Sequence, residues 1–132
     1  MAENQITANE VDEIILELLK LHSQKVFVDE KYFLDLLRHS LSLNTMEKKR
    51  VVDAVPTLSQ FQFYELIKVF KEEREKFKEL AWAHPDDIKN LLAKQQAEWL
   101  ILWDVYRIEK ESKAKQTEDN AQIENIKASL WL

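Results

Sequence analysis

The sequence predicts an all-α protein, a helical bundle of about six helices with a long antiparallel helical hairpin. Apolar residues recur at helical spacing along most of the chain, and no five-residue stretch alternates as a strand would. The 132 residues include no glycine, although average usage of about 7 % would give about nine. Hydrophobic residues make up 45 % and charged residues 33 %, which is typical of a folded chain with a well-solvated surface.

Three short helices are expected in residues 1–56. In chain order they cover about 9–24, 30–44 and 46–55. Thr7 and Glu10 have capping-box spacing before the first helix, and Asp29 is a favourable N-cap for the second. The apolar residues fall on single faces and predict the buried side chains, which are Val11, Ile14, Ile15, Leu18 and His22, then Phe33, Leu36, Leu37 and Leu41, then Val51, Val52 and Val55.

Residues 57–116 are expected to form the hairpin, with helices over 59–84 and 86–115. Ser59 and Gln62 have capping-box spacing at the start of the first of these helices. Pro85 lies between them, where its fixed φ and missing N–H suit the first turn of a helix. A C-terminal helix within 117–132 is expected to fold back onto the hairpin. Together these segments predict one all-α domain over the whole chain.

The two arms of the hairpin predict their own register. Residues equally far from the His84–Pro85 junction should lie at one level, which brings Arg74, a polar break in the first arm, opposite Gln95, a polar break in the second. A polar layer of this kind can fix the register of packed helices. The apolar pairs expected at neighbouring levels are Ala81 with Ile88, Phe77 with Leu92, Phe70 with Trp99, Ile67 with Leu102 and Phe63 with Tyr106.

The composition also predicts the compartment. The chain has no cysteine, which suits a reducing environment. Residues 1–5 lack the basic and apolar regions of a signal peptide. The longest uncharged apolar run, 99–103, is far shorter than the roughly 20 residues of a membrane-spanning helix. We therefore expect a cytoplasmic protein without membrane association.

Residue patterns that indicate catalysis are missing. Phosphate-binding loops and nucleophile elbows need glycine. The three histidines, His22, His39 and His84, lack the carboxylate spacing of metal motifs. Asp104 is the one acid inside an apolar stretch, and it can pair with Arg107. We expect no catalytic, cofactor-binding or metal-binding residues and no small-molecule substrate, with an enzyme of unrecognised type as an open alternative.

Residues 99–108 predict an interaction surface. Eight of these ten residues are apolar, and at 100° per residue they cover well over half of the helix circumference. One arc faces the other arm, and the remainder is covered either by helices of this chain or by a protein partner, a second copy included. Aromatic residues and arginine are common interface anchors, and the candidate contacts are Trp99, Leu100, Trp103, Tyr106, Arg107 and, near the chain end, Trp131.

These features predict a non-catalytic helical interaction, scaffold or regulatory module. Trp131 either docks within the chain or is recognised by another protein. The alternative is a small DNA- or RNA-associated regulator, because three bases open the third helix in a helix-turn-helix-like order. Its candidate contacts are Arg38, Lys48, Lys49 and Arg50. The net charge of −5 argues against nucleic acid as a partner.

Residues 49–66 resemble a pattern of small helical bacterial proteins of uncharacterised activity. In that pattern a short helix ends at a proline and Leu-Ser opens a long helix of mixed charge, as Pro56-Thr57-Leu58-Ser59 does here. The resemblance implies an all-helical fold. It carries over no activity, cofactor or site residue.

Overall fold

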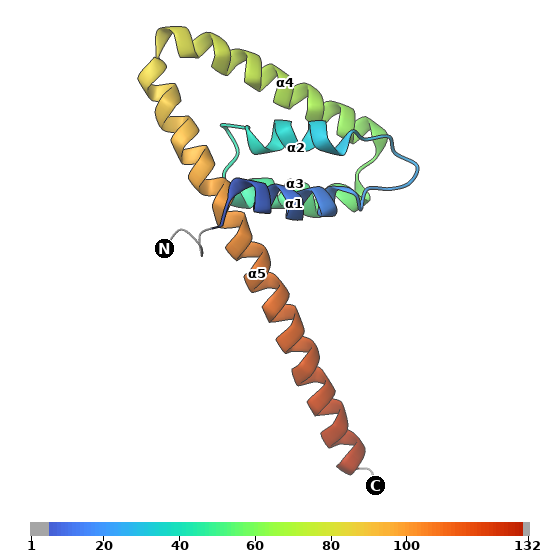
Figure 1. Cartoon of the computed structure of the whole chain (residues 1–132). Helices are drawn as coiled ribbons and strands as arrows, with labels where there is room; N and C mark the ends of the chain where they lie inside the picture. Colours follow the sequence, from blue (N-terminus) through green and yellow to red (C-terminus); the bar gives the residue numbers. More distant parts are fainter. Residues whose placement is uncertain (1–5, 131–132) are drawn as a thin grey trace. The chain divides into compact units, whose positions relative to one another are not determined.

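The computed structural model describes residues 6–130, and it describes side chains over residues 6–115. This part of the chain is helical and contains no strand. Its elements are α1 (Ala8–Leu19), α2 (Glu30–Arg38), α3 (Thr45–Ala54), the 3-10 helix η2 (Val55–Thr57), α4 (Gln60–Ala83) and α5 (Pro85–Leu130) (Figure 1). The all-α prediction is confirmed, but the described residues form five α-helices where about six were predicted.

Side-chain caps set the starts of the first four α-helices. Thr7 and Asp29 each accept a hydrogen bond from the backbone N–H three residues on. Asn44 and Ser59 form reciprocal capping boxes with the residue three positions later. Such caps satisfy N–H groups that the helix leaves free. The caps predicted at Asp29 and Ser59 are confirmed. Thr7 also caps α1, but only its own half of the predicted capping box with Glu10 forms. The helix α3 starts one residue earlier than predicted, at Thr45.

The turns between the helices need no left-handed residue. No described residue has a positive φ, so the conformational freedom of glycine is not required. The longest helices meet at His84, which has φ −135° and ψ 61° and caps α4. Pro85 then opens α5, as predicted.

The chain divides into two compact units, Met1–Leu102 and Trp103–Leu132. The core of the first unit lies where α1, α2, α3 and η2 pack together and where α2 packs on α4. Phe33 is at its centre, with edge-to-face contacts to Phe63 at 5.4 Å and Phe70 at 6.0 Å between ring centroids. The other buried apolar residues are Val11, Ile15, Leu19, Val26, Leu36, Leu37, Val52, Val55, Trp99 and Leu102. The second unit is the remaining part of α5.

The predicted antiparallel hairpin is wrong in its packing. From the corner at His84, α4 and α5 diverge, and α2 lies between them (Figure 1). Within the described residues, α4 and α5 are not among the element pairs with extensive backbone contact. Phe70 packs on Phe33 of α2 instead of on Trp99. The arms separate because the short helices also have apolar faces to bury, and α2 does so against α4.

The predicted separate helix within 117–132 is also wrong, because α5 continues unbroken from Pro85 to Leu130. The stretch 116–121 contains neither proline nor glycine, the residues that end helices most strongly. Trp131 and Leu132 lie outside the described residues, so the docking or recognition of Trp131 stays a prediction. Over the part of the chain that the structure describes, no helix is both long and apolar enough to span a membrane.

Candidate functional site

A groove opens at the corner where α4 and α5 diverge. Its volume is about 440 Å³, and its walls come from the C-terminal half of α2, the second half of α4 and the first turns of α5. Its apolar lining consists of Leu36, Leu41, Phe70, Phe77, Ala81, Ile88 and Leu92. Four of these residues form the two level pairs predicted nearest the corner. The predicted register therefore places these residues on opposite walls of the groove, although α4 and α5 do not pack against each other there.

The polar side of the groove is organised by Glu73 of α4. Its carboxylate accepts hydrogen bonds from the Ser40 hydroxyl at 3.0 Å, the Leu41 N–H at 2.8 Å and the Ser42 N–H at 2.9 Å. Charge-assisted bonds of this kind are stronger than neutral ones. One side chain thus fastens the α2–α3 connection to α4 and fixes that wall of the groove.

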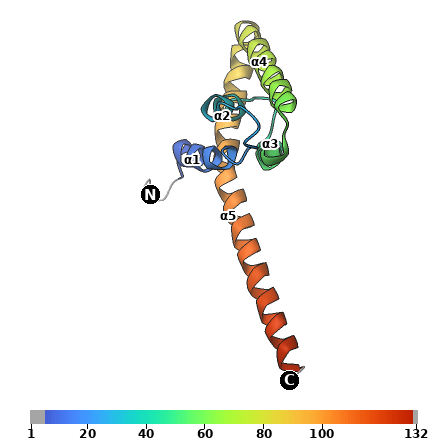
Figure 2. The same ribbon diagram turned by 90° about the vertical axis from the view of Figure 1, so that its right-hand side faces the viewer.

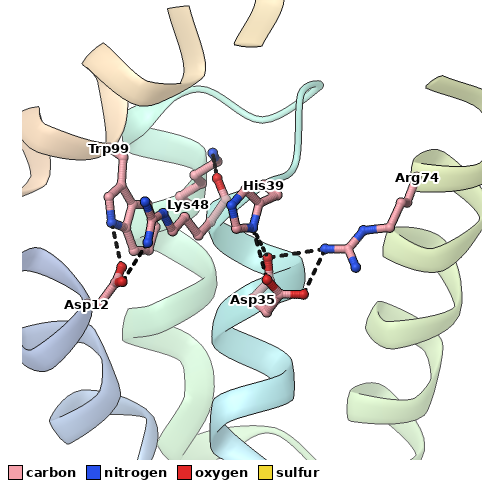
Figure 3. A network of polar contacts seen from close by, with 7 residues as sticks. Asp12, Asp35, His39, Lys48, Arg74 and Trp99 are labelled. Carbon is pink, nitrogen blue, oxygen red and sulfur yellow. Dashed lines mark hydrogen bonds and ion pairs between the residues drawn. The ribbon is translucent and has the colours of Figure 1, made fainter. Parts of the chain in front are cut away.

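A second set of polar contacts joins α2 to α4 through Asp35. Its carboxylate accepts from Arg74 at 3.1 Å, and the His39 ring Nδ1, which bonds to the Asp35 backbone carbonyl at 2.9 Å, lies 3.1 Å from the same carboxylate (Figure 3). The predicted layer of Arg74 with Gln95 is therefore wrong, because Arg74 pairs with α2 and Gln95 lines a different pocket. Asp35 on the intervening helix is a charged partner for Arg74, whereas Gln95 offers only a neutral amide.

Deeper in the first unit, Asp12 connects α1 to two other elements, α5 and α2. It accepts from the Trp99 indole N–H at 2.9 Å and from Arg38 at 2.6 Å (Figure 3). Figure 2 shows α1 to one side of α5 and α3 to the other where α5 passes between them. Thr45 of α3 also donates to the backbone carbonyl of Glu98 in α5, at 2.8 Å. These bonds hold α5 in the core through polar atoms as well as apolar packing.

Lys48 of α3 has a fully buried side chain. Its ammonium group donates to the Arg38 carbonyl at 2.9 Å and lies 5.7 Å from the centroid of the Trp99 ring. Burial lowers the pKa of Lys48 from 10.5 to about 8, and the nearby carboxylates of Glu98 and Glu73 partly oppose this shift. A charge this deep has a structural role and does not face solvent.

The predicted interaction residues lie at different depths. Trp99 is 1 % exposed and belongs to the core of the first unit. Leu100, Trp103 and Tyr106 are half-buried. Arg107 is exposed and pairs with Asp104 and Glu111. Trp99 is thus covered by α1 and α3 of the same chain, which leaves only the other residues as candidates for a partner.

The basic residues predicted to meet nucleic acid do not form one surface. Lys48 points into the core, and Arg38 is half-buried against Asp12. Lys49 pairs with Asp53, one turn further along α3. Arg50 is exposed. Phosphate binding needs clustered, accessible bases, and this arrangement offers little support for it.

Sequence reasoning missed Asp12, Asp35 and Glu73, which hold the short helices against α4 and α5. They occur among many acids, so spacing does not single them out. Lys48 did carry a signal, because it lies on the helical stripe of Val52 and Val55. A lysine on the apolar face of a helix predicts a buried ammonium group and not a surface-exposed one.

The described residues contain no cluster of three or more side chains suited to hold a metal ion. No family model, no curated protein and no solved structure matches this chain. The resemblance of residues 49–66 to small helical bacterial proteins therefore stays a prediction. Function has to be argued from the geometry.

Proposed function

We propose that the protein is a non-catalytic binding module of the cytoplasm, and that the groove at the α4–α5 corner receives an amphipathic helix of a protein partner. The groove itself is the observation that carries this proposal. Its volume of about 440 Å³ and its apolar lining suit the side chains on one face of a helix. Nothing in the groove requires chemistry, because its carboxylates already accept hydrogen bonds from fixed partners.

The walls of the groove are held in place before a partner arrives. Glu73 fixes the α2–α3 connection, and the Arg74–Asp35 pair fixes α2 against α4. Ordering loops and side chains on binding opposes affinity, so a surface already held in place binds more tightly than a mobile one of the same area. The Glu73 hydrogen bonds and the Arg74–Asp35 ion pair therefore support recognition by a preformed groove.

The charges along the groove balance. Asp35 and Glu73 are opposed by Arg74 and Lys78, so no strong field of either sign surrounds the apolar lining. A partner helix would then bind mainly through burial of apolar surface, and its affinity should change little with salt. This separates the proposal from nucleic-acid binding, which weakens steeply as salt rises.

An exposed tryptophan follows the last α4 residue of the groove lining in sequence. Trp82 follows the lining residue Ala81 in α4 and is 91 % exposed, and Leu80 and Leu92 are also exposed. Tryptophan, tyrosine and arginine are enriched among the residues that contribute most to binding in protein interfaces. We place Trp82 at the edge of the contact with the partner.

The proposal is tested with a phage-displayed library of helical peptides selected on the immobilised protein. Selected peptides should carry apolar residues at i, i+4 and i+7, and binding measured by calorimetry should vary little between 50 and 500 mM salt, about the range over which nucleic-acid affinity falls by orders of magnitude. Ala81→Arg should weaken binding at least tenfold, because the new side chain fills the groove. Val69→Arg, on an exposed part of α4 outside the groove lining, is the matched control.

Two outcomes would contradict the proposal. One is a selected peptide whose affinity is the same for the Ala81→Arg variant and for the unsubstituted protein. The other is saturable binding to a random DNA duplex that weakens steeply with salt, which would favour the nucleic-acid alternative through Arg50 and its neighbours.

A further inference from the structure

We propose that the protein has a second interaction surface, at the start of α4, which binds a protein segment that combines apolar and acidic side chains. The surface covers the first three turns of α4 and the end of the α1–α2 connection, which is hydrogen-bonded to α4 there (Figure 1). Its members are all exposed, and they are Phe27, Lys31, Phe61, Tyr64, Lys68 and Lys71. This aromatic–lysine surface shares no residue with the groove lining, and the inference does not depend on the proposed function.

Phe27 is 88 % exposed although its backbone is held in place. The Gln60 side chain accepts a hydrogen bond from the Phe27 N–H at 2.7 Å and donates one to the Phe27 carbonyl at 3.0 Å. The preceding residue, Val26, is buried. The fold thus presents this ring to solvent from a fixed piece of backbone, and a preordered contact residue costs less entropy on binding than a mobile one.

Phe61, Tyr64, Lys68 and Lys71 follow one another along one stripe of α4. Their spacings of three and four residues make successive members neighbours on the helix surface. Phe61 is 70 % and Tyr64 is 60 % exposed. Phe27, which Gln60 holds, lies at the same end of this stripe. Three rings therefore gather at one end of the surface, and an exposed apolar patch with a polar border is typical of an interaction site.

The lysines lie at the other end of the surface. The ammonium group of Lys71 is 5.6 Å from the centroid of the Tyr32 ring, a contact that brings this end of the stripe next to α2. Lys31 precedes Tyr32 and adds a third exposed base. Within residues 6–115 none of the three lysines forms an ion pair, whereas the exposed Lys20 and Lys78 each do. Their ammonium groups are therefore available to carboxylates of a partner.

The order of rings and lysines selects the class of partner. A protein segment can place apolar side chains on the rings and carboxylates beside the lysines. A second copy bound through the same face would add its own lysines to these. Single-stranded nucleic acid repeats base and phosphate at every nucleotide, whereas here rings and lysines are separated. A membrane would have to take up Glu65, which lies one turn from Phe61, together with the rings, and burial of an unpaired charge is costly.

Two acids beside the surface orient the partner. Glu65 and Glu72 are exposed on the adjoining stripe of α4. They repel carboxylates on that side, so the acidic part of the partner has to lie on the other side, between Lys71 and α2. The apolar part then covers Phe27 and Phe61.

The test selects random twelve-residue peptides, displayed on phage, on the immobilised full-length protein. Phage that also bind the Phe27→Ser variant are removed, so that the remaining peptides depend on the ring and their charge is a free outcome. These peptides should combine apolar residues with at least two acidic ones. Their affinity should fall several-fold between 50 and 500 mM salt, because salt screens exposed ion pairs.

Charge reversal then tests the lysines. The double variant Lys68→Glu/Lys71→Glu should weaken binding of the selected peptides at least tenfold. Lys76→Glu/Lys89→Glu makes the same change in charge at exposed positions outside the surface and should alter the affinity by less than about twofold. All four positions are exposed, and circular dichroism verifies that both variants are folded.

A second ring variant and a groove variant complete the experiment. Tyr64→Ser, which plays no part in the selection, should weaken binding at least tenfold and leave the salt dependence unchanged, because it removes no charge. Ala81→Arg, which fills the groove, should leave the affinity unaltered. Failure of the aromatic–lysine surface and failure of the groove are thus separate results.

Three results would overturn the inference. The first is a selection that returns no peptide dependent on Phe27, or only peptides without acidic residues. The second is equal affinity of the selected peptides for the Lys68→Glu/Lys71→Glu variant and for its control. The third is tighter binding of a twenty-residue oligothymidylate or of phosphatidylserine vesicles than of any selected peptide, which would assign the surface to nucleic acid or to a membrane.

Discussion

Lys48 brings a positive charge into the core of a protein whose other buried positions are mostly apolar. The ammonium is tolerated because it has a carbonyl acceptor, the face of Trp99 and the carboxylates of Glu98 and Glu73 nearby. These contacts do not fully replace water, since the pKa falls to about 8. Stability should therefore depend on whether this one group carries its proton.

The sign of that dependence follows from proton binding. Between pH 8 and pH 10.5 the unfolded chain keeps the Lys48 proton and the folded chain releases it. The free energy of unfolding should then rise with pH across this interval, by at most about 3 kcal/mol. Below pH 8 both states are protonated and the contribution is constant. Urea unfolding at several pH values from 7 to 10 measures the rise.

Lys48→Met should remove this rise and make the protein more stable at pH 7, by about 1 kcal/mol. Methionine has a similar shape, and the gain from removing a buried charge exceeds the lost hydrogen bond and ring contact. Lys110→Met, at an exposed position of α5, is the control. A Lys48→Met variant that keeps the same rise would show that other groups cause it.

Asp12→Asn should destabilise the protein by about 2 kcal/mol, because it leaves Arg38 without its anion while the indole of Trp99 keeps one acceptor. Asp104→Asn, which alters an exposed pair with Arg107, should change the free energy of unfolding by less than about 0.5 kcal/mol. Chemical denaturation followed by circular dichroism compares the two variants. Equal losses would contradict a special role for Asp12.

At the scale of single elements, the connection between α1 and α2 is held by His22. Its ring donates at two points, from Nδ1 to the Ser23 carbonyl and from Nε2 to the Glu30 carboxylate, each at 2.9 Å. The bond to the Ser23 carbonyl and the bond to Glu30 raise the pKa of His22 above 6.5. A backbone N–H and His22 lower the pKa of Glu30 below 4.5. Each shift favours the charged pair.

The two shifts define a pH window for this connection. The His22 contribution is fully present below pH 6.5 and is lost as pH rises through the raised pKa, and the Glu30 contribution is lost as pH falls through the lowered pKa. Stability from the pair should be largest between pH 4.5 and 6.5. His22→Gln should flatten the fall between pH 6 and 8 in urea unfolding. His84→Gln, at an exposed position, should not.

The connection between α2 and α3 depends on Glu73 in a way that hydrogen exchange can detect. Glu73→Gln removes the charge and leaves a single acceptor oxygen for the three donors at Ser40, Leu41 and Ser42. Amide exchange at Leu41 and Ser42 should accelerate at least tenfold while the core helices stay protected. Glu75→Gln, at an exposed position of α4, is the control. Unchanged exchange would show that packing alone holds this connection.

Local features of these elements were predictable from sequence, and their packing was not. The caps at Asp29 and Ser59 and the start at Pro85 depend on neighbouring residues only, so short spacing rules suffice. The position of α2 between α4 and α5 depends on Phe33 packing against Phe63 and Phe70, residues far away in the sequence. Many apolar residues in this chain could form such contacts, and no local pattern selects among them. The groove follows from that placement and was therefore not predictable.

For the molecule as a whole, the divergence of α4 and α5 decides which tryptophans are covered by the chain itself. Trp99 should resist acrylamide quenching, and Trp82 should be quenched readily, since they are 1 % and 91 % exposed. Variants that keep only one of the four tryptophans, with phenylalanine elsewhere, allow the comparison. Protection of Trp99 should not change with protein concentration. Loss of protection on dilution would show instead that a second copy covers it.

Leu41 lines both the groove and the smaller pocket of about 170 Å³ between the α2–α3 connection and α5. The same short connection therefore forms part of the groove wall and is held there by hydrogen bonds from the Leu41 and Ser42 N–H groups to Glu73. Exchange of these two amide hydrogens with solvent requires the wall to open. A partner that binds in the groove should thus slow their exchange, so two backbone amides of the free wall would report occupancy of the groove.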